Sequence, residues 1–310
     1  MCKCLYCYQL LNHGEVDFHP GCAKKIFGTN EVPVLDYTMD EIDTLAAEVI
    51  QEQTSLTGVQ PKLSLHLGEH DGSKRFTIVG LWGGYIMKPQ TESYPQLPEI
   101  EDLTMHLAEI AKIAVVPHTL MRMADNSICY LTRRIDRTSK GEKIPMEDFC
   151  QLTERQTEYK YNSSYEVVGK AILRYSSMPK MDVTNFMDIL LFSWITGNND
   201  MHLKNFSLFA AQVGKYRLTP AYDLLNVAIV NPKDKEELAL TLNGKKSNIK
   251  AKDFIIAAST LSLPENVITN LFGKYKALGE KFIEYINHSF LTDELKEQYI
   301  TLISERLSRI

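Results

Sequence analysis

The chain has 310 residues, an apolar share of 44% and a net charge of −5, which suits a globular protein with a substantial buried core. The acidic balance disfavours broad, sequence-independent nucleic-acid binding, which needs a basic face. No apolar run reaches the length of a membrane span, and the first residues lack the apolar core of a signal peptide. We therefore expect a cytoplasmic protein that binds neither membranes nor nucleic acid directly.

A cysteine-rich segment comes first. Cys4-x-x-Cys7 is followed by His19-x-x-Cys22, and this two-plus-two spacing is typical of a tetrahedral Cys3His zinc site. In a reducing compartment such a cluster predicts a metal site before it predicts disulfides. So short a segment holds too few apolar side chains to fold by burial alone, so zinc would be structural here. Cys2 is an alternative to Cys4, and reduced thiols in a tail without metal are the other interpretation.

A mixed α/β region follows. The pattern predicts a helix over 36–53, strands over 62–67, 85–87 and 128–133, and a helix over 99–114. Between the first helix and the first strand stands the turn S-L-T-G-V-Q-P-K. A small-residue turn that feeds a strand can cover ATP phosphates with backbone N–H groups, although neither G-x-G-x-x-G nor a Walker A string occurs.

One lysine stands where a phosphate-binding residue is expected. Lys88 ends the strand predicted at 85–87, which is the context of the kinase lysine that holds the α- and β-phosphates. Glu101 in the next helix is the first candidate for its ion-pair partner, and Glu99 is the second. The alternative is a solvated lysine beside acids that suit the helix dipole, with Asp102 among them.

The second half is mostly helical. The pattern predicts an exposed polar loop over 153–164, helices over 165–175 and 182–195, a strand over 206–209, a mobile excursion over 231–250 around a strand at 237–242, and helices beyond.

The polar run T-G-N-N-D-M-H-L-K-N lies at 196–205, between a buried helix and a buried strand. Asp200 and Asn205 have the D-x-x-x-x-N spacing of the protein-kinase catalytic loop, in which the Asp handles the proton of the acceptor hydroxyl and the Asn binds magnesium. Asp223, in T-P-A-Y-D, is the predicted second magnesium ligand. The alternative is an Asn-rich turn in which Asp200 caps a helix.

Two further residues of this run bear on the chemistry. Lys204 is predicted to neutralise charge that develops on a transferred phosphoryl group. His202 is predicted to hold Asp200 in place, in preference to direct chemistry.

Six motifs stand in the chain in order: S-L-T-G-V-Q-P-K-L-S-L (55–65), Y-I-M-K-P (85–89), R-I-D-R (134–137), P-M-E-D-F-C-Q (145–151), G-N-N-D-M-H-L-K-N-F-S-L (197–208) and P-A-Y-D (220–223). Together they resemble the HipA-like serine/threonine kinases, which are toxins of bacterial toxin–antitoxin systems. The resemblance covers the chain from about Ser55 to its C-terminus.

The resemblance implies an α+β, two-lobed, protein-kinase-like fold. Its domains would be a zinc-knuckle-like segment at 1–30, a small mixed α/β N-lobe at 31–140, and a mostly helical C-lobe at 141–310.

The resemblance also implies an ATP- and Mg²⁺-dependent protein kinase. Its catalytic set would be Asp200, His202 and Lys204, and its magnesium ligands Asn205 and Asp223. The nucleotide would be bound by Ser55, Thr57, Gly58, Val59, Gln60, Lys62, Lys88, Glu101, Arg133, Ile135, Gln151 and Tyr222.

Two hydroxyls of the phosphate loop have a regulatory role in this family. Ser55 occupies the position of autophosphorylation, and Thr57 matches a second hydroxyl of the split HipT-type relatives. A phosphate there would repel the ATP phosphates; the alternative is that both hydroxyls only satisfy turn geometry. Adenine would bind backbone groups near Arg133 and Ile135, and Arg133 replaces an acidic residue common in relatives.

The resemblance implies partners as well. The expected substrate is an aminoacyl-tRNA synthetase, and the expected regulator is a DNA-binding antitoxin. Only residues 1–54 precede the phosphate loop, which resembles the split HipT arrangement, in which a small separate protein supplies the N-terminal subdomain. The competing hypothesis is a catalytically silent pseudokinase that acts as a scaffold in an antitoxin–DNA complex.

Overall fold

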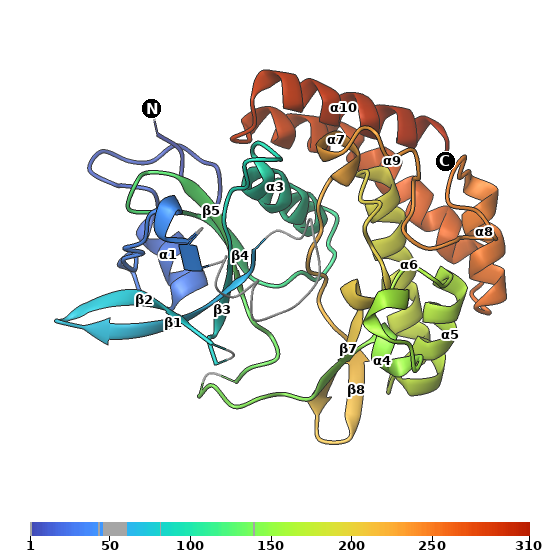
Figure 1. The fold of residues 1–310 in the computed structure, drawn as a ribbon. Coiled ribbons are helices and arrows are strands. Elements are labelled where there is room, and N and C mark those ends of the chain that lie inside the picture. Colours follow the sequence, from blue (N-terminus) through green and yellow to red (C-terminus); the bar gives the residue numbers. More distant parts are fainter. Residues whose placement is uncertain (1, 43, 46–60, 81, 139) are drawn as a thin grey trace. The chain divides into compact units, whose positions relative to one another are not determined.

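The computed structural model describes residues 2–42, 44–45, 61–80, 82–138 and 140–310. The chain divides into two compact units (Figure 1), which are Met1–Asp102 with Val116–Lys143, and Leu103–Val115 with Ile144–Ile310. The three domains expected from the sequence remain a prediction. Within the described residues no helix combines the length and apolarity needed to cross a bilayer.

The first unit is built on a five-stranded antiparallel sheet of order β2-β1-β3-β5-β4. Its elements are α1 (Pro20–Phe27), β1 (Leu63–His70), β2 (Ser73–Val79), β3 (Tyr85–Lys88), β4 (His118–Arg122) and β5 (Ile128–Arg133). Leu63, Met87 and Leu131 lie opposite one another on β1, β3 and β5 and are buried. The three strands predicted in this region are confirmed, and β2 and β4 were not predicted.

The sequence predicted two helices in this region, at 36–53 and 99–114. The helix predicted over 36–53 is described only at 39–42 and 44–45, where it is helical, and the rest lies outside the described residues. α3 (Leu97–Ile110) begins two residues before the predicted start and ends earlier. Its first turns belong to the first unit and its remainder to the second.

The second unit combines a three-stranded sheet of order β6-β7-β8 with helices. Its strands are β6 (Met146–Asp148), β7 (Ser207–Gln212) and β8 (Lys215–Leu218), and its α-helices are α4 (Phe149–Leu152), α5 (Tyr165–Tyr175), α6 (Pro179–Ile195), α7 (Val227–Val230), α8 (Ala251–Thr260), α9 (Glu265–His288) and α10 (Asp293–Ser308). α6 is apolar almost all round, so it lies in the centre of the unit, with Phe186, Leu190 and Trp194 completely buried.

The prediction of a strand at 237–242 was wrong, and the apolar side chains of this segment are buried. Alternating leucines gave a strand pattern, but all three are buried, and the segment makes isolated bridges, between Thr241 and Ser164 and between Leu242 and Lys245, in place of a ladder. Glu237 anchors its start: the carboxylate accepts a hydrogen bond from Trp194 Nε1 (3.1 Å) and pairs with Arg309 (3.0 Å). Burial without a neighbouring strand therefore produces the same alternation.

Gly197 ends α6 in the left-handed region, with φ of +75°. A Cβ there would lie 2.5 Å from Leu302 Cδ2 and 2.7 Å from Asn226 Oδ1. We expect Gly197→Ala to lower the free energy of unfolding by roughly 2–4 kcal/mol, from the conformation and the clash together. Urea denaturation measures this. The control is Gly214→Ala, since Gly214 has φ of +72° and open space around it; an equal loss in both variants would contradict the clash.

Candidate active site

The predicted catalytic residues of the second unit stand on the connection between α6 and β7. The left-handed turn at Gly197 directs the chain away from the helix axis. Met201 and Leu203 are then buried side chains that fix the connection in the core. Asp200 directly precedes Met201, Asn205 follows Leu203 by two residues, and both are partly exposed.

Asp200 is held from two directions. The Tyr161 hydroxyl donates a hydrogen bond to Asp200 Oδ1 (2.6 Å). Asn205 Nδ2 donates to the backbone carbonyl of Asp200 (2.8 Å). Because the amide nitrogen of Asn205 is used in this way, its Oδ1 is the atom that would face a cation. The structure therefore brings Asp200 and Asn205 together.

Asn198 joins this loop to the segment that carries Asp223. Its side-chain oxygen accepts a hydrogen bond from the backbone N–H of Asp200 (3.3 Å), and its Nδ2 donates to the backbone carbonyl of Asp223 (3.4 Å). Asn198 is only 1% exposed, so this bridge is a buried one. One amide thus fixes the backbone of the predicted base against that of the predicted magnesium ligand.

Asp223 adopts the left-handed conformation, with φ of +54°, which Asp tolerates better than most residues. The preceding residue, Tyr222, holds the segment in place, since its hydroxyl donates to the Lys204 carbonyl (3.1 Å) and bonds to Ser207 Oγ (2.6 Å). Asp223 therefore follows a residue that is tied to the chain just before Asn205. In this unit Tyr222 fixes the backbone around the loop.

His202 is a neutral, buried side chain. Burial lowers its pKa to about 4, although the charge of Asp200 acts in the opposite direction. Its Nδ1 accepts a hydrogen bond from the Lys204 N–H (3.3 Å), which assigns the proton to Nε2. Its ring packs edge-on against Tyr161, at 5.0 Å between centroids. His202 therefore contacts Asp200 directly, through its backbone N–H, which donates to the Asp200 carbonyl (2.8 Å), while its ring packs on Tyr161.

Lys204 and Gln151 meet at the start of α4. Lys204 Nζ lies 3.0 Å from Asp148 Oδ2. Asp148 also caps α4, and the Gln151 side chain completes the capping box by accepting from the Asp148 N–H (3.1 Å). Lys204 is thus held by a carboxylate and about one third exposed. Its role toward a phosphoryl group stays a prediction, as does nucleotide binding by Gln151.

In the first unit, Lys88 is the last residue of β3 and forms an ion pair with Glu101 of α3. Both side chains are buried, at 4% and 1% exposure. The Lys88 ammonium also lies 5.3 Å from the centre of the Tyr130 ring. Of the two acids considered from the sequence, Glu101 is therefore the partner, and Glu99 is not. A buried pair at this place matches the Lys–Glu pair that protein kinases need.

The structure says less about the other residues that were predicted to bind the nucleotide. Ser55, Thr57, Gly58, Val59 and Gln60 lie outside the described residues, and Lys62 directly precedes β1. The Arg133 N–H donates to the Pro117 carbonyl (2.8 Å), so this donor is used inside the unit. Ile135 follows β5 and is partly exposed.

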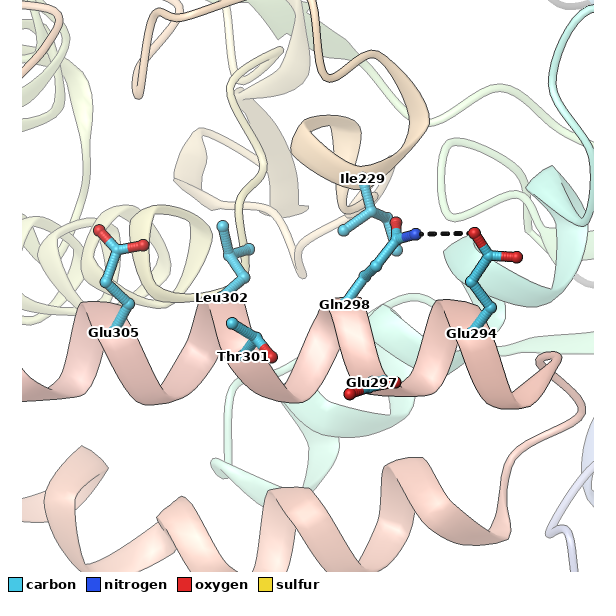
Figure 2. Close-up of a pocket in the computed structure, with 7 residues that line it drawn as sticks. All are labelled: Ile229, Glu294, Glu297, Gln298, Thr301, Leu302 and Glu305. Carbon is cyan, nitrogen blue, oxygen red and sulfur yellow. Dashed lines mark hydrogen bonds between the residues drawn. The ribbon is translucent and has the colours of Figure 1, made fainter.

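The second unit also has a hollow of about 460 Å³ beside α7 and α10 (Figure 2). Ile229 and Leu302 line it together with Glu294, Glu297 and Glu305. None of the predicted site residues lies there. Three carboxylates disfavour a phosphate-bearing ligand, so the hollow is not a nucleotide site.

Sequence reasoning missed three residues of this arrangement. Tyr161 fell in a stretch interpreted as an exposed loop, and Asn198 and Asp148 were parts of motifs without a stated role. The available signals were weak: an aromatic residue in a polar stretch for Tyr161, and a further amide shortly before Asp200 for Asn198. Only the fold brings Tyr161 and Asp148 to the loop, and the Asp223 carbonyl to Asn198.

The chain is similar to known proteins over most of its length. Residues 54–281 match the family model described as the HipA-like C-terminal domain. The chain belongs to this HipA-like family. The resemblance inferred from the six motifs is confirmed, whereas the likeness to the split HipT-type members stays a prediction.

Two relatives illustrate the distance within the family. The "Putative kinase" of Haemophilus influenzae is 24% identical over 262 residues, which cover 76% of the HipA-like chain and 75% of that protein. The serine/threonine-protein kinase toxin HipA of Shewanella oneidensis is 26% identical over 253 residues, covering 75% of the chain and 57% of that protein. The chain thus spans little more than half the length of that toxin.

Two solved structures share the fold. HipA of Shewanella oneidensis, solved with HipB and its operator DNA, has a TM-score of 0.68 at 23% identity, over 85% of the HipA-like chain and 70% of that chain. The Helicobacter pylori proinflammatory kinase CtkA has a TM-score of 0.52 at 18% identity, over 80% and 93%. The predicted mixed α/β, kinase-like fold class is therefore confirmed.

Proposed function

We propose that the HipA-like chain is an ATP- and Mg²⁺-dependent protein serine/threonine kinase and the toxin of a bacterial toxin–antitoxin system. The observation that carries the proposal is the set of hydrogen bonds that ties Asp200, Asn205 and Asp223 to one another through backbone groups. An Asn-rich turn would need no such link to a second segment. Membership of a family with named kinases supports the same activity.

The donor set fits a magnesium ion. The Asn205 Oδ1 and the Asp223 carboxylate are hard oxygen ligands of the kind that Mg²⁺ takes together with phosphate oxygens and water. When bound, the ion would neutralise the charge of the β- and γ-phosphates. The chain's own residues would do the rest. Asp200 would orient the acceptor hydroxyl and take its proton, and the Lys88–Glu101 pair of the first unit would hold the α- and β-phosphates.

The substrate and partners follow from the family and are part of this proposal. We infer an aminoacyl-tRNA synthetase as the protein substrate, autophosphorylation at Ser55 or Thr57, and a DNA-binding antitoxin as the regulator. The solved complex of Shewanella HipA with HipB and operator DNA supports the last inference. Ser55 and Thr57 lie outside the described residues, so their modification rests on sequence alone.

One experiment tests activity and target together. The chain is expressed briefly in a bacterium, and phosphopeptides are compared with those of cells that express Asp200→Asn. We expect phosphoserine or phosphothreonine on one synthetase and on the chain's own loop at 55–60, in the active cells alone. Equal phosphopeptides in both cultures would overturn the kinase proposal.

We expect Asn198→Ala to lower kcat by roughly 10- to 100-fold, because the amide that aligns the two segments is gone and small misplacements of reacting groups are costly. KM for ATP should change little, since Lys88 and Glu101 are untouched. Asn198→Asp keeps the acceptor for the Asp200 N–H and loses the donor, so its kcat should be intermediate. Steady-state kinetics with Asn266→Ala, an exposed asparagine, is the control. A change in KM alone would contradict the positioning role.

A further inference from the structure

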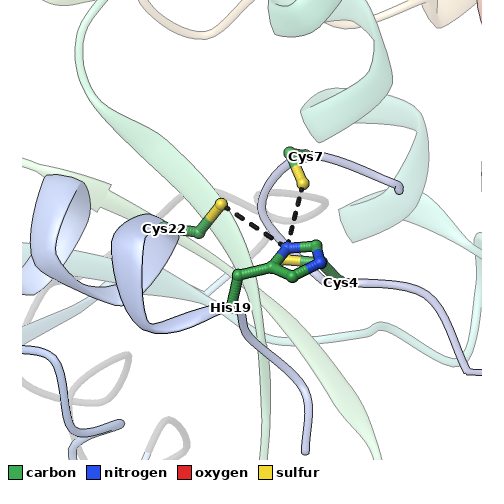
Figure 3. A group of neighbouring side chains, drawn as sticks. All are labelled: Cys4, Cys7, His19 and Cys22. Carbon is green, nitrogen blue, oxygen red and sulfur yellow. Dashed lines mark hydrogen bonds between the residues drawn. The ribbon is translucent and has the colours of Figure 1, made fainter. Parts of the chain in front are cut away.

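Four side chains of the N-terminal segment converge in the first unit (Figure 3). Each of Cys4, Cys7, His19 and Cys22 offers one ligand atom, and all four atoms lie within 4.8 Å of one another. His19 Nδ1 is 3.5 Å from Cys7 Sγ and 3.8 Å from Cys22 Sγ. Tetrahedral geometry around one Zn²⁺ places sulfur and nitrogen ligands roughly 3.5 Å apart. The spacing therefore leaves room for one ion in the middle.

The imidazole of His19 is oriented as a ligand. Its Nε2 lies 3.1 Å from the Leu10 carbonyl, which can only accept, so Nε2 carries the proton and Nδ1 keeps its lone pair toward the sulfurs. A backbone carbonyl on the remote nitrogen is the usual support of a metal-bound histidine.

The backbone is also arranged for thiolates. Cys22 lies in the first turn of α1, where the helix dipole favours negative charge, and Pro20 starts that helix. Cys2 is exposed and outside the cluster, which settles the ambiguity between Cys2 and Cys4.

We propose that Cys4, Cys7, His19 and Cys22 bind one Zn²⁺ in a closed, tetrahedral, structural site. Three thiolates and one imidazole complete the coordination, so no position remains for substrate or water. The site lies within the first unit and uses none of the residues assigned to phosphoryl transfer.

The N-terminal segment that carries the four ligands is hydrogen-bonded to the first half of α3. Tyr8, at φ of +63° directly after Cys7, donates its hydroxyl hydrogen bond to Asp102 Oδ2 (2.7 Å). Asp102 is the neighbour of Glu101, which pairs with Lys88. We infer that zinc binding fixes this end of α3 and thereby the ion pair; its effect on ATP binding rests on the proposed kinase function.

A second pair of contacts holds the knuckle on β4. Arg122 makes a bidentate ion pair with Asp17, at 3.0 and 2.9 Å. The Thr119 hydroxyl donates to the Leu5 carbonyl (3.3 Å). The segment that carries the four ligands is therefore an integral part of the first unit. Loss of zinc should lower the stability of the sheet of this unit.

Metal analysis tests the site directly. Full-length chain purified without chelator should contain one zinc per chain by elemental analysis. After dialysis against a chelator, titration with Co²⁺ should give the visible absorption of tetrahedral thiolate-bound cobalt, with an end point at one equivalent. Zn²⁺ should then displace it. Absence of zinc together with no cobalt absorption would overturn the proposal, and so would iron bound in its place.

Two cysteine variants distinguish a proposed ligand from a nearby cysteine outside the cluster. Cys22→Ser should lose at least tenfold in zinc affinity, whereas Cys2→Ser should keep the wild-type value. Equal loss in both would overturn the ligand set. The cobalt titration of the wild type remains decisive if Cys22→Ser does not fold. Asp200→Asn should retain full zinc while losing phosphoryl transfer, so failure of the zinc site and failure of the kinase proposal are distinguishable.

Tyr8→Phe tests the link to α3. This variant keeps all four ligands and should hold one zinc. In the wild type, chelation should lower the melting temperature and expose Lys88 to amine-reactive labelling. Tyr8→Phe should show higher Lys88 labelling even with zinc bound. Unchanged labelling in both cases would overturn the coupling to α3 while leaving the metal site standing.

Discussion

Asp200→Asn is expected to lower the rate of phosphoryl transfer by roughly 10²–10⁴-fold, the usual contribution of a positioned general base. Asparagine has the size of aspartate and can still accept the Tyr161 hydrogen bond, so the loop should keep its shape. What is lost is the negative charge that takes the proton of the acceptor hydroxyl. Initial rates with labelled ATP and Mg²⁺ measure the loss, and KM for ATP should stay near the wild-type value.

The matched control for this variant is Asp71→Asn. Asp71 lies in the turn between β1 and β2, 90% exposed and at φ of +49°, a conformation that asparagine also accepts. It should have wild-type activity and stability. A wild-type rate for Asp200→Asn, with the melting temperature also unchanged, would show that this carboxylate is not the base. Another residue would then have to be the base, whereas the pseudokinase interpretation would be favoured if the wild-type chain itself transferred no phosphate.

Lys88→Met is expected to lower the free energy of unfolding by roughly 3–5 kcal/mol, because Glu101 would stay buried at 1% exposure without its cationic partner. The same change removes the charge assigned to the ATP phosphates, so nucleotide-dependent thermal stabilisation should disappear. Urea denaturation and melting with and without MgATP measure the two effects separately.

Two variants sharpen this prediction. Lys74→Met breaks the surface pair of Lys74 with Glu69 (2.7 Å), whose side chains are 40% and 61% exposed, and it should cost at most about 1 kcal/mol. The double variant Lys88→Met with Glu101→Met removes both charges and should recover most of the stability but none of the nucleotide response. A recovery of nucleotide binding in the double variant would contradict the role of the pair.

The local elements could be predicted from the sequence because their signals are local. α5 begins and ends at the expected residues, since an apolar period is preceded by Ser164, whose hydroxyl accepts from the Val167 N–H. The loop after α6 was placed by its neighbours: a buried helix, Gly197 and a short strand. The Lys88–Glu101 pairing was predicted with the help of the family resemblance, because the strand end and the acids of the helix start also fit a solvated lysine and the helix dipole.

The rest depends on contacts between distant segments, which leave no local pattern. Tyr161 reaches Asp200 from a stretch without periodicity, and Asn198 meets the Asp223 carbonyl across the unit. The alternating leucines at 237–242 satisfy a strand pattern, yet no neighbouring strand is present among the residues described around them. Likewise, spacing alone could not choose between Cys2 and Cys4, whereas burial does.

The hydrogen bond from Tyr161 has a stereochemical consequence. A carboxylate has two oxygens, and Tyr161 takes Oδ1 of Asp200. Under the proposed kinase function, we expect an incoming serine or threonine hydroxyl to approach Oδ2, since the bond from Tyr161 already occupies one of the lone pairs of Oδ1. The Tyr161 phenol would then favour some directions of approach of the acceptor hydroxyl over others.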